Sequence, residues 1–207
     1  MKPGDTLVKQ ILQINSSVFG SQGESTQLAN QLVSQLAEQH GANVMVRDVS
    51  SNPIPHQDAG FLQALSSPAN TRYKEQPSKV AFADQLIEEL QISDILVIGL
   101  PMYNFSVPST LKSWFDHIAR AGVTFRYTEN GPEGLLTDKQ AIVITTRGGI
   151  HKDTILDTET PFVKSFLAFI GITNVSFIYA EGLNMGEKIK AQALTEARNQ
   201  LKELLLN

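Results

Sequence analysis

Three loops of this chain carry the side chains best suited to chemistry, and each loop follows an apolar, β-branched run. They span residues 16–26, 101–108 and 146–151. Hydroxyls, side-chain amides, aromatic rings and glycine backbone dominate these loops, which contain no carboxylate pair and no cysteine. Because the carboxyl ends of parallel strands meet at one edge of a sheet, we expect the loops to form a single site. Their chemistry suits a phosphorylated, planar cofactor.

The first loop joins a predicted strand to a predicted helix and contains Ser17, Gly23, Glu24 and Ser25. Free N–H groups and the dipole at a helix N-terminus favour an anion, and the two serines could add hydroxyl donors. The alternative is a plain turn in which Ser25 caps an ordinary helix. The loop lacks both the G-x-G-x-x-G fingerprint and a P-loop lysine, which argues against a tightly bound dinucleotide and a nucleoside triphosphatase. The phosphate of flavin mononucleotide (FMN) is compatible with it.

The second loop places Met102, Tyr103, Asn104 and Phe105 between two prolines. The two aromatic rings offer flat apolar surface, and Asn104 offers a donor and an acceptor to the edge of a heterocyclic ring. The alternative is a rigid strand-to-helix connection whose aromatic side chains belong to the core. An asparagine between two aromatics at a strand end favours ring binding.

The third loop contains Thr146, Arg147, Gly148, Gly149 and His151. The glycines permit close approach of the backbone, so their N–H groups could face a ring carbonyl or a developing anion. Arg147 could instead pair with a carboxylate, and the glycine pair could be a simple turn. His151 could position a substrate or supply a proton, and an exposed loop histidine is the alternative.

Five apolar runs predict strands over residues 7–14, 44–49, 95–100, 141–145 and 175–180. Helical spacing of apolar residues lies between them, and a final helix is predicted over 187–205. This alternation predicts an α/β fold, namely a flavodoxin-like, doubly wound, five-stranded parallel sheet with helices on both faces. Residues 50–78 are rich in proline and polar residues, so we expect a long excursion with a short helix near 59–65.

Composition limits the possible functions. A chain of 207 residues with 42% hydrophobic content predicts a single domain over residues 1–207. A net charge of −4 without long basic clusters argues against a nucleic-acid partner. The absence of cysteine excludes disulfides, thiolate metal ligands and a cysteine nucleophile. The sequence shows neither a signal-peptide core nor a membrane span, so we expect a cytoplasmic protein without a membrane partner.

Three segments of the chain, residues 102–105, 119–134 and 146–151, closely resemble FMN-dependent NADH azoreductases. The likeness extends from the first strand to Gly182, and its most specific part is residues 120–134. The first loop departs from the family pattern, because Gly23-Glu24-Ser25 stands where a member more often has Ser-Gln-Ser. This departure affects side-chain contacts and leaves the backbone contacts untouched.

The resemblance implies a homodimer that binds one FMN per subunit near the subunit interface. It places Ser17 and residues 23–25 at the phosphate, and residues 102–105 and 146–149 around the isoalloxazine ring. It also implies that NADH reduces the flavin and leaves before an azo compound or a quinone enters. Tyr127, Phe169 and His151 are the implied substrate-pocket residues, although Phe169 also fits the apolar face of its helix. Asn104 and His151 are the candidate catalytic residues.

The strongest alternative is a flavodoxin-like electron-transfer protein, which binds FMN but passes single electrons to protein partners. Such a carrier is expected to have a more acidic surface than a net charge of −4 provides, and it needs no aromatic substrate pocket. A serine hydrolase acting through Ser16 or Ser17 would lack the usual G-x-S-x-G turn. A phospho-receiver domain needs an acidic pocket where this chain has Asn15-Ser16-Ser17.

Overall fold

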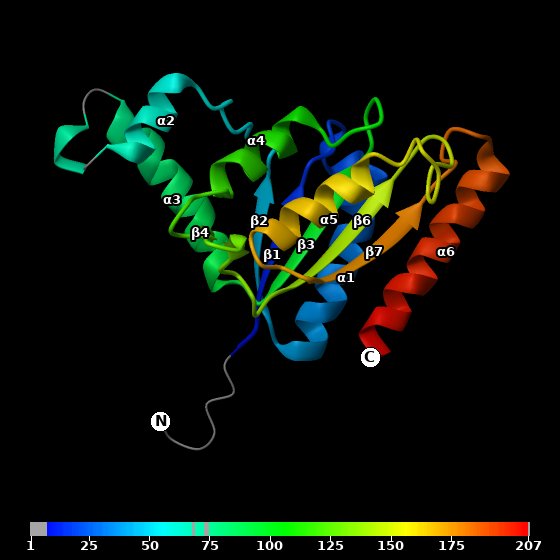
Figure 1. Cartoon of the computed structure of the whole chain (residues 1–207). Helices are drawn as coiled ribbons and strands as arrows, with labels where there is room; N and C mark the ends of the chain where they lie inside the picture. The colour runs from blue at the N-terminus through cyan, green and yellow to red at the C-terminus, as the bar shows by residue number, and fades with distance from the viewer. Residues whose placement is uncertain (1–7, 68, 73–74, 207) are drawn as a thin grey trace, which may run out of the picture.

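The computed structural model describes residues 8–67, 69–72 and 75–206, whose strands form a five-stranded parallel sheet between two layers of helices (Figure 1). The strands of this sheet are β1 (Gln10–Asn15), β2 (Asn43–Asp48), β3 (Ile95–Pro101), β6 (Gln140–Thr146) and β7 (Asn174–Ala180). Their order in the sheet is β2-β1-β3-β6-β7. The predicted flavodoxin-like fold and its five parallel strands are confirmed. Leu7, at the start of the first predicted strand, lies outside the described residues.

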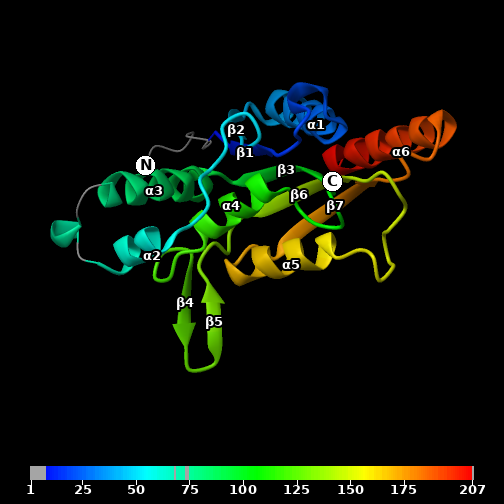
Figure 2. The same ribbon diagram turned by 90° about the horizontal axis from the view of Figure 1, so that it is seen from above.

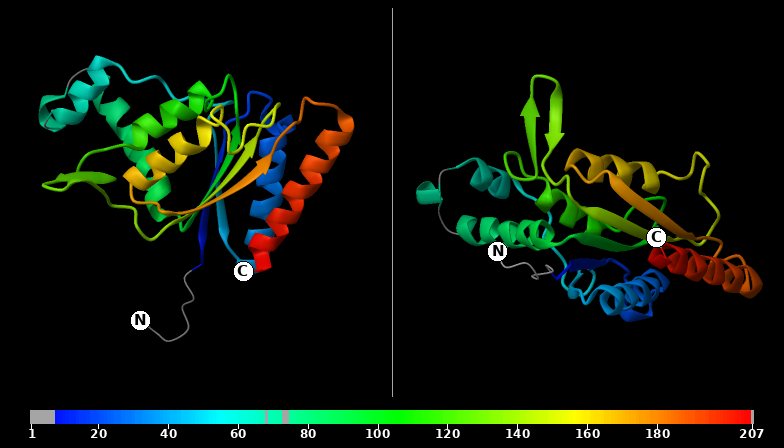
Figure 3. Two further views of the ribbon diagram at one scale, coloured as in Figure 1. Left: turned by 45° about the vertical axis from the view of Figure 1, so that its right-hand side comes forward. Right: turned by 90° about the horizontal axis from the view of Figure 1, so that it is seen from below.

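Helices cover both faces of the sheet. They are α1 (Glu24–His40), α3 (Gln76–Ile92), α4 (Ser109–Ile118), α5 (Glu159–Phe169) and α6 (Glu187–Leu206), whereas α2 (Ala59–Ser66) packs against α3. One apolar core joins the sheet to α1 and α6, and the other joins it to α3, α4 and α5 (Figure 3). In the part of the chain that the structure describes, no helix is long and apolar enough to cross a membrane.

Burial explains why the strands could be predicted. Every residue of β3 is buried, as expected for a central strand with helices on both faces, whereas the edge strand β2 is partly exposed.

The first helix ends at the predicted glycine, because Gly41 follows α1 in the left-handed conformation, with φ of 59°. Glycine adopts that conformation without the steric cost that a side chain brings.

The excursion over residues 50–78 contains the expected short helix, α2, which packs against α3. Helix α3 begins at Gln76 and includes Pro77 in its first turn, where a missing N–H costs nothing. The helix therefore starts inside the segment that the sequence assigns to the excursion. Pro68 and residues 73–74 of that segment lie outside the described residues.

A hairpin formed by β4 (Phe125–Thr128) and β5 (Gly131–Gly134), which the sequence did not predict, projects from the sheet (Figure 2). The backbone holds its base tightly, since a Cβ atom added to Gly134 would lie 2.0 Å from the backbone nitrogen of Gly171. The hairpin is therefore held in place by a contact between segments that lie far apart in the sequence.

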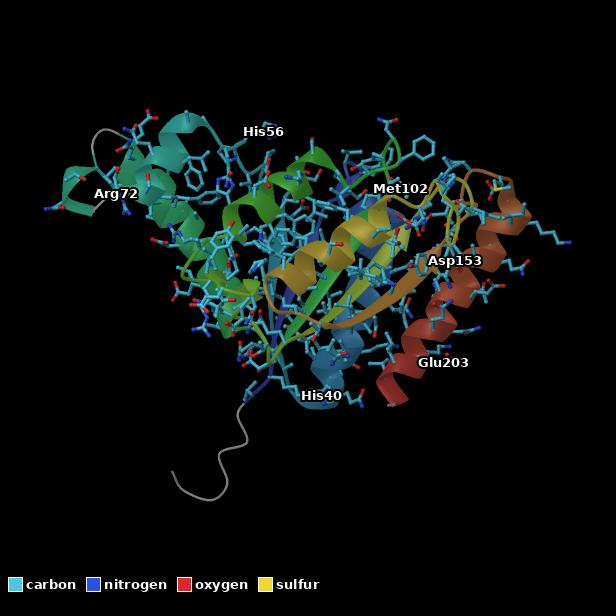
Figure 4. All side chains as sticks on the ribbon, viewed as in Figure 1. His40, His56, Arg72, Met102, Asp153 and Glu203 are labelled. Carbon is cyan, nitrogen blue, oxygen red and sulfur yellow. The ribbon has the colours of Figure 1, made fainter. Side chains whose placement is uncertain are left out.

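The strand order reverses between β1 and β3, the position at which ligands bind in open α/β sheets. The carboxyl ends of β1, β3, β6 and β7 lie together at the upper edge of the sheet in Figure 1. Figure 4 shows Met102 and Asp153 toward this edge and His40 at the opposite end of the molecule. The predicted loops are therefore positioned at the edge where a ligand is expected.

Candidate functional site

A cavity of about 330 Å³ opens between the loops that follow β1, β3, β6 and β7. This volume is in the range of small-molecule sites. Residues from all three predicted loops line it, namely Ser17, Gly23, Glu24, Met102, Tyr103, Thr146, Arg147 and Gly148. The structure thus brings the three loops together around one space.

The N-terminus of α1 presents hydrogen-bond donors that no group in the described chain uses. The first helical hydrogen bond runs from the N–H of Gln27 to the carbonyl of Gly23, so the N–H groups of residues 24–26 have no acceptor. The hydroxyls of Ser25 and Thr26 are buried without a partner. Gly23, not Ser25, is the capping residue, so the plain-cap interpretation of Ser25 is wrong. These unused donors suit an anion such as phosphate.

Gly23 leaves the space that keeps this end of the cavity open. A Cβ atom at Gly23 would lie 2.1 Å from Ser17 Oγ and 2.5 Å from Ser17 Cβ. Ser17 is buried, and its Oγ accepts a hydrogen bond from the N–H of Phe19 and lies 3.4 Å from the Tyr103 hydroxyl. The N–H of Val18 also donates to the Tyr103 hydroxyl, at 3.3 Å. Tyr103 therefore ties the second loop to the first.

The second loop turns sharply at Asn104 and Phe105, whose φ angles are 49° and 65°. The N–H of Ser106 donates to the Tyr103 carbonyl at 3.1 Å, which closes the turn. A positive φ on a residue other than glycine costs of order 1–3 kcal/mol, and such strain often occurs at functional sites. The exposed Asn104 side chain makes no hydrogen bond in the described chain, so its amide is available to a ligand. The Phe105 ring lies edge-on to His151, with centroids 5.5 Å apart.

In the third loop, the carbonyls of Gly148 and Gly149 accept hydrogen bonds, but their N–H groups have no acceptor in the described chain. Asn184 N–H donates to the Gly148 carbonyl at 3.0 Å, and Gly182 N–H donates to the Gly149 carbonyl at 2.9 Å. Within the described residues, the N–H groups of Gly148 and Gly149 donate to nothing. They are therefore available to an electron-rich oxygen of a ligand. The His151 ring lies beside this backbone, because a Cβ atom at Gly149 would be 2.7 Å from His151 Nε2.

The guanidinium group of Arg147 belongs to a buried ion cluster. It is fully buried and contacts Asp157 at 2.8 Å, Glu159 at 3.3 Å and Glu181 at 3.2 Å. The alternative that Arg147 pairs with a carboxylate is confirmed. Glu181 Oε1 also accepts a hydrogen bond from the N–H of His151 at 2.8 Å, so the cluster anchors the third loop.

Charge in this cluster is not balanced by Arg147 alone, since three carboxyl groups surround one cation. Burial raises the pKa of Glu159 to about 7, against the hydrogen bonds from Thr145 and Arg147 that lower it. Glu159 Oε1 is buried without a partner. Burial also disfavours the ionised form of Asp157, but hydrogen bonds from Arg147 and Thr160 hold its pKa below the usual range. Glu159 therefore takes up a proton at a higher pH than an ordinary glutamate does.

Tyr127 and Phe169 lie in a separate aromatic cluster, not around the cavity. Phe125 contacts both, with ring centroids 5.5 Å from Tyr127 and 4.2 Å from Phe169. Phe169 packs against the apolar core, as the face of its helix indicates. Tyr127 is 74% exposed on the hairpin. Within one copy of the chain, the structure does not bring these two residues to the predicted loops.

A fourth loop, which follows β7 and could not be recognised from the three predicted loops, contributes Leu183 and Asn184 to the cavity, and Lys190 on the first turn of α6 also lines it. Lys190 Nζ lies 2.8 Å from Glu24 Oε1 and so connects α6 to α1. The signal was present, because Gly182 and Gly186 follow an apolar run, as glycines do in the third loop. Both have positive φ in the structure.

Known proteins share this architecture. A family model described as flavodoxin-like fold matches residues 9–205. An FMN-dependent NADH:quinone oxidoreductase from Alcanivorax borkumensis is 53% identical over 192 residues, which cover 92% of this chain and 97% of that protein. The crystal structure of azoreductase AzrA is 26% identical with a TM-score of 0.83, over 94% of this chain and 99% of that one.

A second solved structure, an FMN-dependent NADH-azoreductase from Bacillus anthracis in complex with FMN, shares the fold at 23% identity. Its TM-score is 0.84, and the match covers 96% of this chain and 100% of that one. The resemblance noted in the sequence is confirmed by the family match and by the level of identity to the Alcanivorax protein. The chain therefore belongs to the flavodoxin-like family that includes the FMN-dependent NADH:quinone oxidoreductases.

Proposed function

We propose that this protein is an FMN-dependent NADH oxidoreductase that reduces quinones to hydroquinones and azo compounds to aromatic amines. The observation that carries the proposal is the set of unused donors at one cavity, at the N-terminus of α1 and at Gly148, which is followed in the chain by the unused N–H group of Gly149. The relative from Alcanivorax borkumensis, 53% identical, is named for this activity on quinones. When bound, FMN would supply the redox chemistry that connects NADH to the second substrate.

The chain's own residues bind, orient and stabilise charge. Ser17, Ser25 and the free amides of residues 24–26 would hold the phosphate, and residues 102–105 and 146–149 the ring. Because Gly148 and Gly149 have free N–H groups, they can stabilise negative charge that develops on a ring oxygen. A quinone needs one hydride and one further proton, and we propose that His151, whose ring lies beside that of Phe105, supplies that proton. An azo bond needs two such cycles to give two amines.

Steady-state kinetics test this proposal. Protein freed of flavin is expected to oxidise NADH with a quinone only after FMN is added. Varying NADH at several fixed quinone concentrations should give parallel double-reciprocal lines, as expected for a ping-pong cycle. An electron carrier would bind FMN without oxidising NADH, and that result would contradict the proposal.

Ser16, considered above as a hydrolase nucleophile, is fully buried and donates a hydrogen bond from its hydroxyl to the Gly99 carbonyl at 2.8 Å.

Asn104→Gly is expected to weaken FMN binding or slow flavin reduction by about tenfold, the loss typical of one to two hydrogen bonds. Glycine adopts the positive φ of this position without strain, so the substitution removes the amide and keeps the turn. The measurements are the FMN dissociation constant from fluorescence quenching and the rate of flavin reduction by NADH in stopped flow. If both values match those of the wild type, Asn104 does not contact the ring.

We further propose that the protein acts in the cytoplasm as a homodimer with one FMN per subunit, and that the hairpin of one copy completes the cavity of the other. Twofold dimers are the commonest oligomers of soluble proteins. The hairpin projects from the sheet (Figure 2), and Tyr127 on it is 74% exposed and remote from the cavity of its own chain. NADH as electron donor fits an intracellular location.

Tyr127→Ala is expected to lower kcat/KM for the quinone by about tenfold, because an aromatic contact with the substrate is lost. The dissociation constant of FMN should stay at the wild-type value. If the hairpin acts on the other copy, mixing Tyr127→Ala with a variant that cannot hold FMN should restore roughly a quarter of the wild-type activity after subunit exchange. No recovery from two folded, exchanging variants would contradict the shared site.

A further inference from the structure

The end of the cavity proposed for the FMN phosphate contains a carboxylate. Glu24 is the first residue of α1 and lines the cavity together with Ser17 and Gly23. A phosphate monoester carries close to two negative charges at neutral pH. The site therefore places a like charge beside the anion that it must hold, which is unfavourable unless a cation compensates for it.

Two basic side chains line the cavity in the described part of the chain, those of Arg147 and Lys190. Arg147 is fully buried and already bonded to three carboxyl groups. Lys190, on the first turn of α6, has a side chain that is 36% exposed, and its Nζ lies 2.8 Å from Glu24 Oε1. The hydrogen bond to Glu24 raises the pKa of Lys190, so the ammonium group stays charged. Lys190 is the cation left to meet a phosphate.

We propose that Lys190 is a phosphate-binding residue of this cavity, shared between Glu24 and the 5′-phosphate of FMN. An ammonium group has three donors, so it can bond to a carboxylate and to a phosphate oxygen at the same time. Glu24 holds it beside the free N–H groups of residues 24–26. The inference rests on the proposed function, because it assigns a residue to the cofactor of that function.

NADH also carries phosphate groups, so the same cation could serve either ligand. The position of Lys190 favours FMN, since its partner Glu24 is the first residue of the helix whose donors are unused. A purely structural ion pair between α1 and α6 is the other alternative, and exposed pairs of this kind contribute little to stability. Comparison of FMN with riboflavin, which lacks the phosphate, separates these possibilities.

The test titrates the full-length, flavin-free protein with FMN and with riboflavin and follows quenching of flavin fluorescence. Lys190→Gln is expected to raise the FMN dissociation constant by about tenfold, to leave that of riboflavin unchanged, and to lose its effect at high salt. Lys188→Gln is the matched control, because Lys188 carries the same charge on the same helix but is exposed and does not line the cavity. It should change neither constant. Lys190→Arg should recover most of the FMN affinity.

An equal effect on FMN and riboflavin, or no effect on either, would overturn the assignment of Lys190 to the phosphate. An unchanged FMN constant together with a raised KM for NADH would also overturn it, since the phosphate would then belong to NADH. Wild-type protein that binds neither flavin would instead defeat the proposed function itself. The failure of the inference and that of the function are therefore distinguishable in one set of titrations.

Discussion

Arg147→Met is expected to lower the free energy of unfolding by about 3–5 kcal/mol, the cost of leaving buried charge without its partner. The substitution keeps an apolar stem but removes the cation that contacts Asp157, Glu159 and Glu181. Urea unfolding of the flavin-free protein measures the loss. Arg126→Met is the matched control, because the Arg126–Glu133 pair is 58% and 49% exposed. That control should cost less than about 1 kcal/mol.

The loss of unfolding free energy in Arg147→Met, called the deficit below, should depend on pH. Burial raises the pKa of Glu159 to about 7 even with Arg147 present, and loss of the guanidinium group is expected to raise it further. A carboxyl group with a raised pKa favours the folded state at low pH and loses this contribution as pH rises through its folded pKa. The deficit is therefore expected to be largest above pH 7 and to shrink as pH falls toward 5. A small, pH-independent deficit would show that the cluster is not what holds this region together.

Gly23→Ala is expected to raise the FMN dissociation constant by at least about tenfold, which corresponds to 1.4 kcal/mol of binding free energy. The new Cβ atom would lie 2.5 Å from Ser17 Cβ, so Ser17 must shift, and with it the hydroxyl that contacts Tyr103. Gly60→Ala in α2 is the control, since among the described residues its Cβ atom would meet only Asp58 Oδ1, at 3.3 Å. Wild-type FMN affinity in Gly23→Ala would place the phosphate elsewhere.

The sheet could be predicted because buried parallel strands are continuous apolar runs, as β3 shows with every residue buried. The hairpin could not, because β5 has the sequence Gly-Pro-Glu-Gly and no apolar residue that alternates. Its position depends on the close approach of Gly134 to Gly171, and the exposed pair between Arg126 and Glu133 joins its two strands. These contacts join residues that no local pattern relates.

The location of the site could likewise be predicted, because loops at strand ends converge wherever the strands are parallel. The partner that each side chain contacts could not be predicted. Arg147 reaches Glu181 across 34 positions of sequence, a contact that exists only once β6 and β7 pair. Lys190 meets Glu24 because α1 and α6 cover the same face of the sheet. The packing of helices and strands against one another therefore decides which partner each side chain of the site contacts.

The proposed function requires that FMN bound to this chain accept electrons from NADH. The deciding measurement is the visible absorption spectrum of the protein with one equivalent of FMN, recorded without oxygen before and after one equivalent of NADH. We expect the flavin band to bleach and a quinone or an azo dye to restore it. Bound FMN that keeps its band after NADH would contradict an NADH oxidoreductase, and a spectrum of free FMN would contradict the cofactor site.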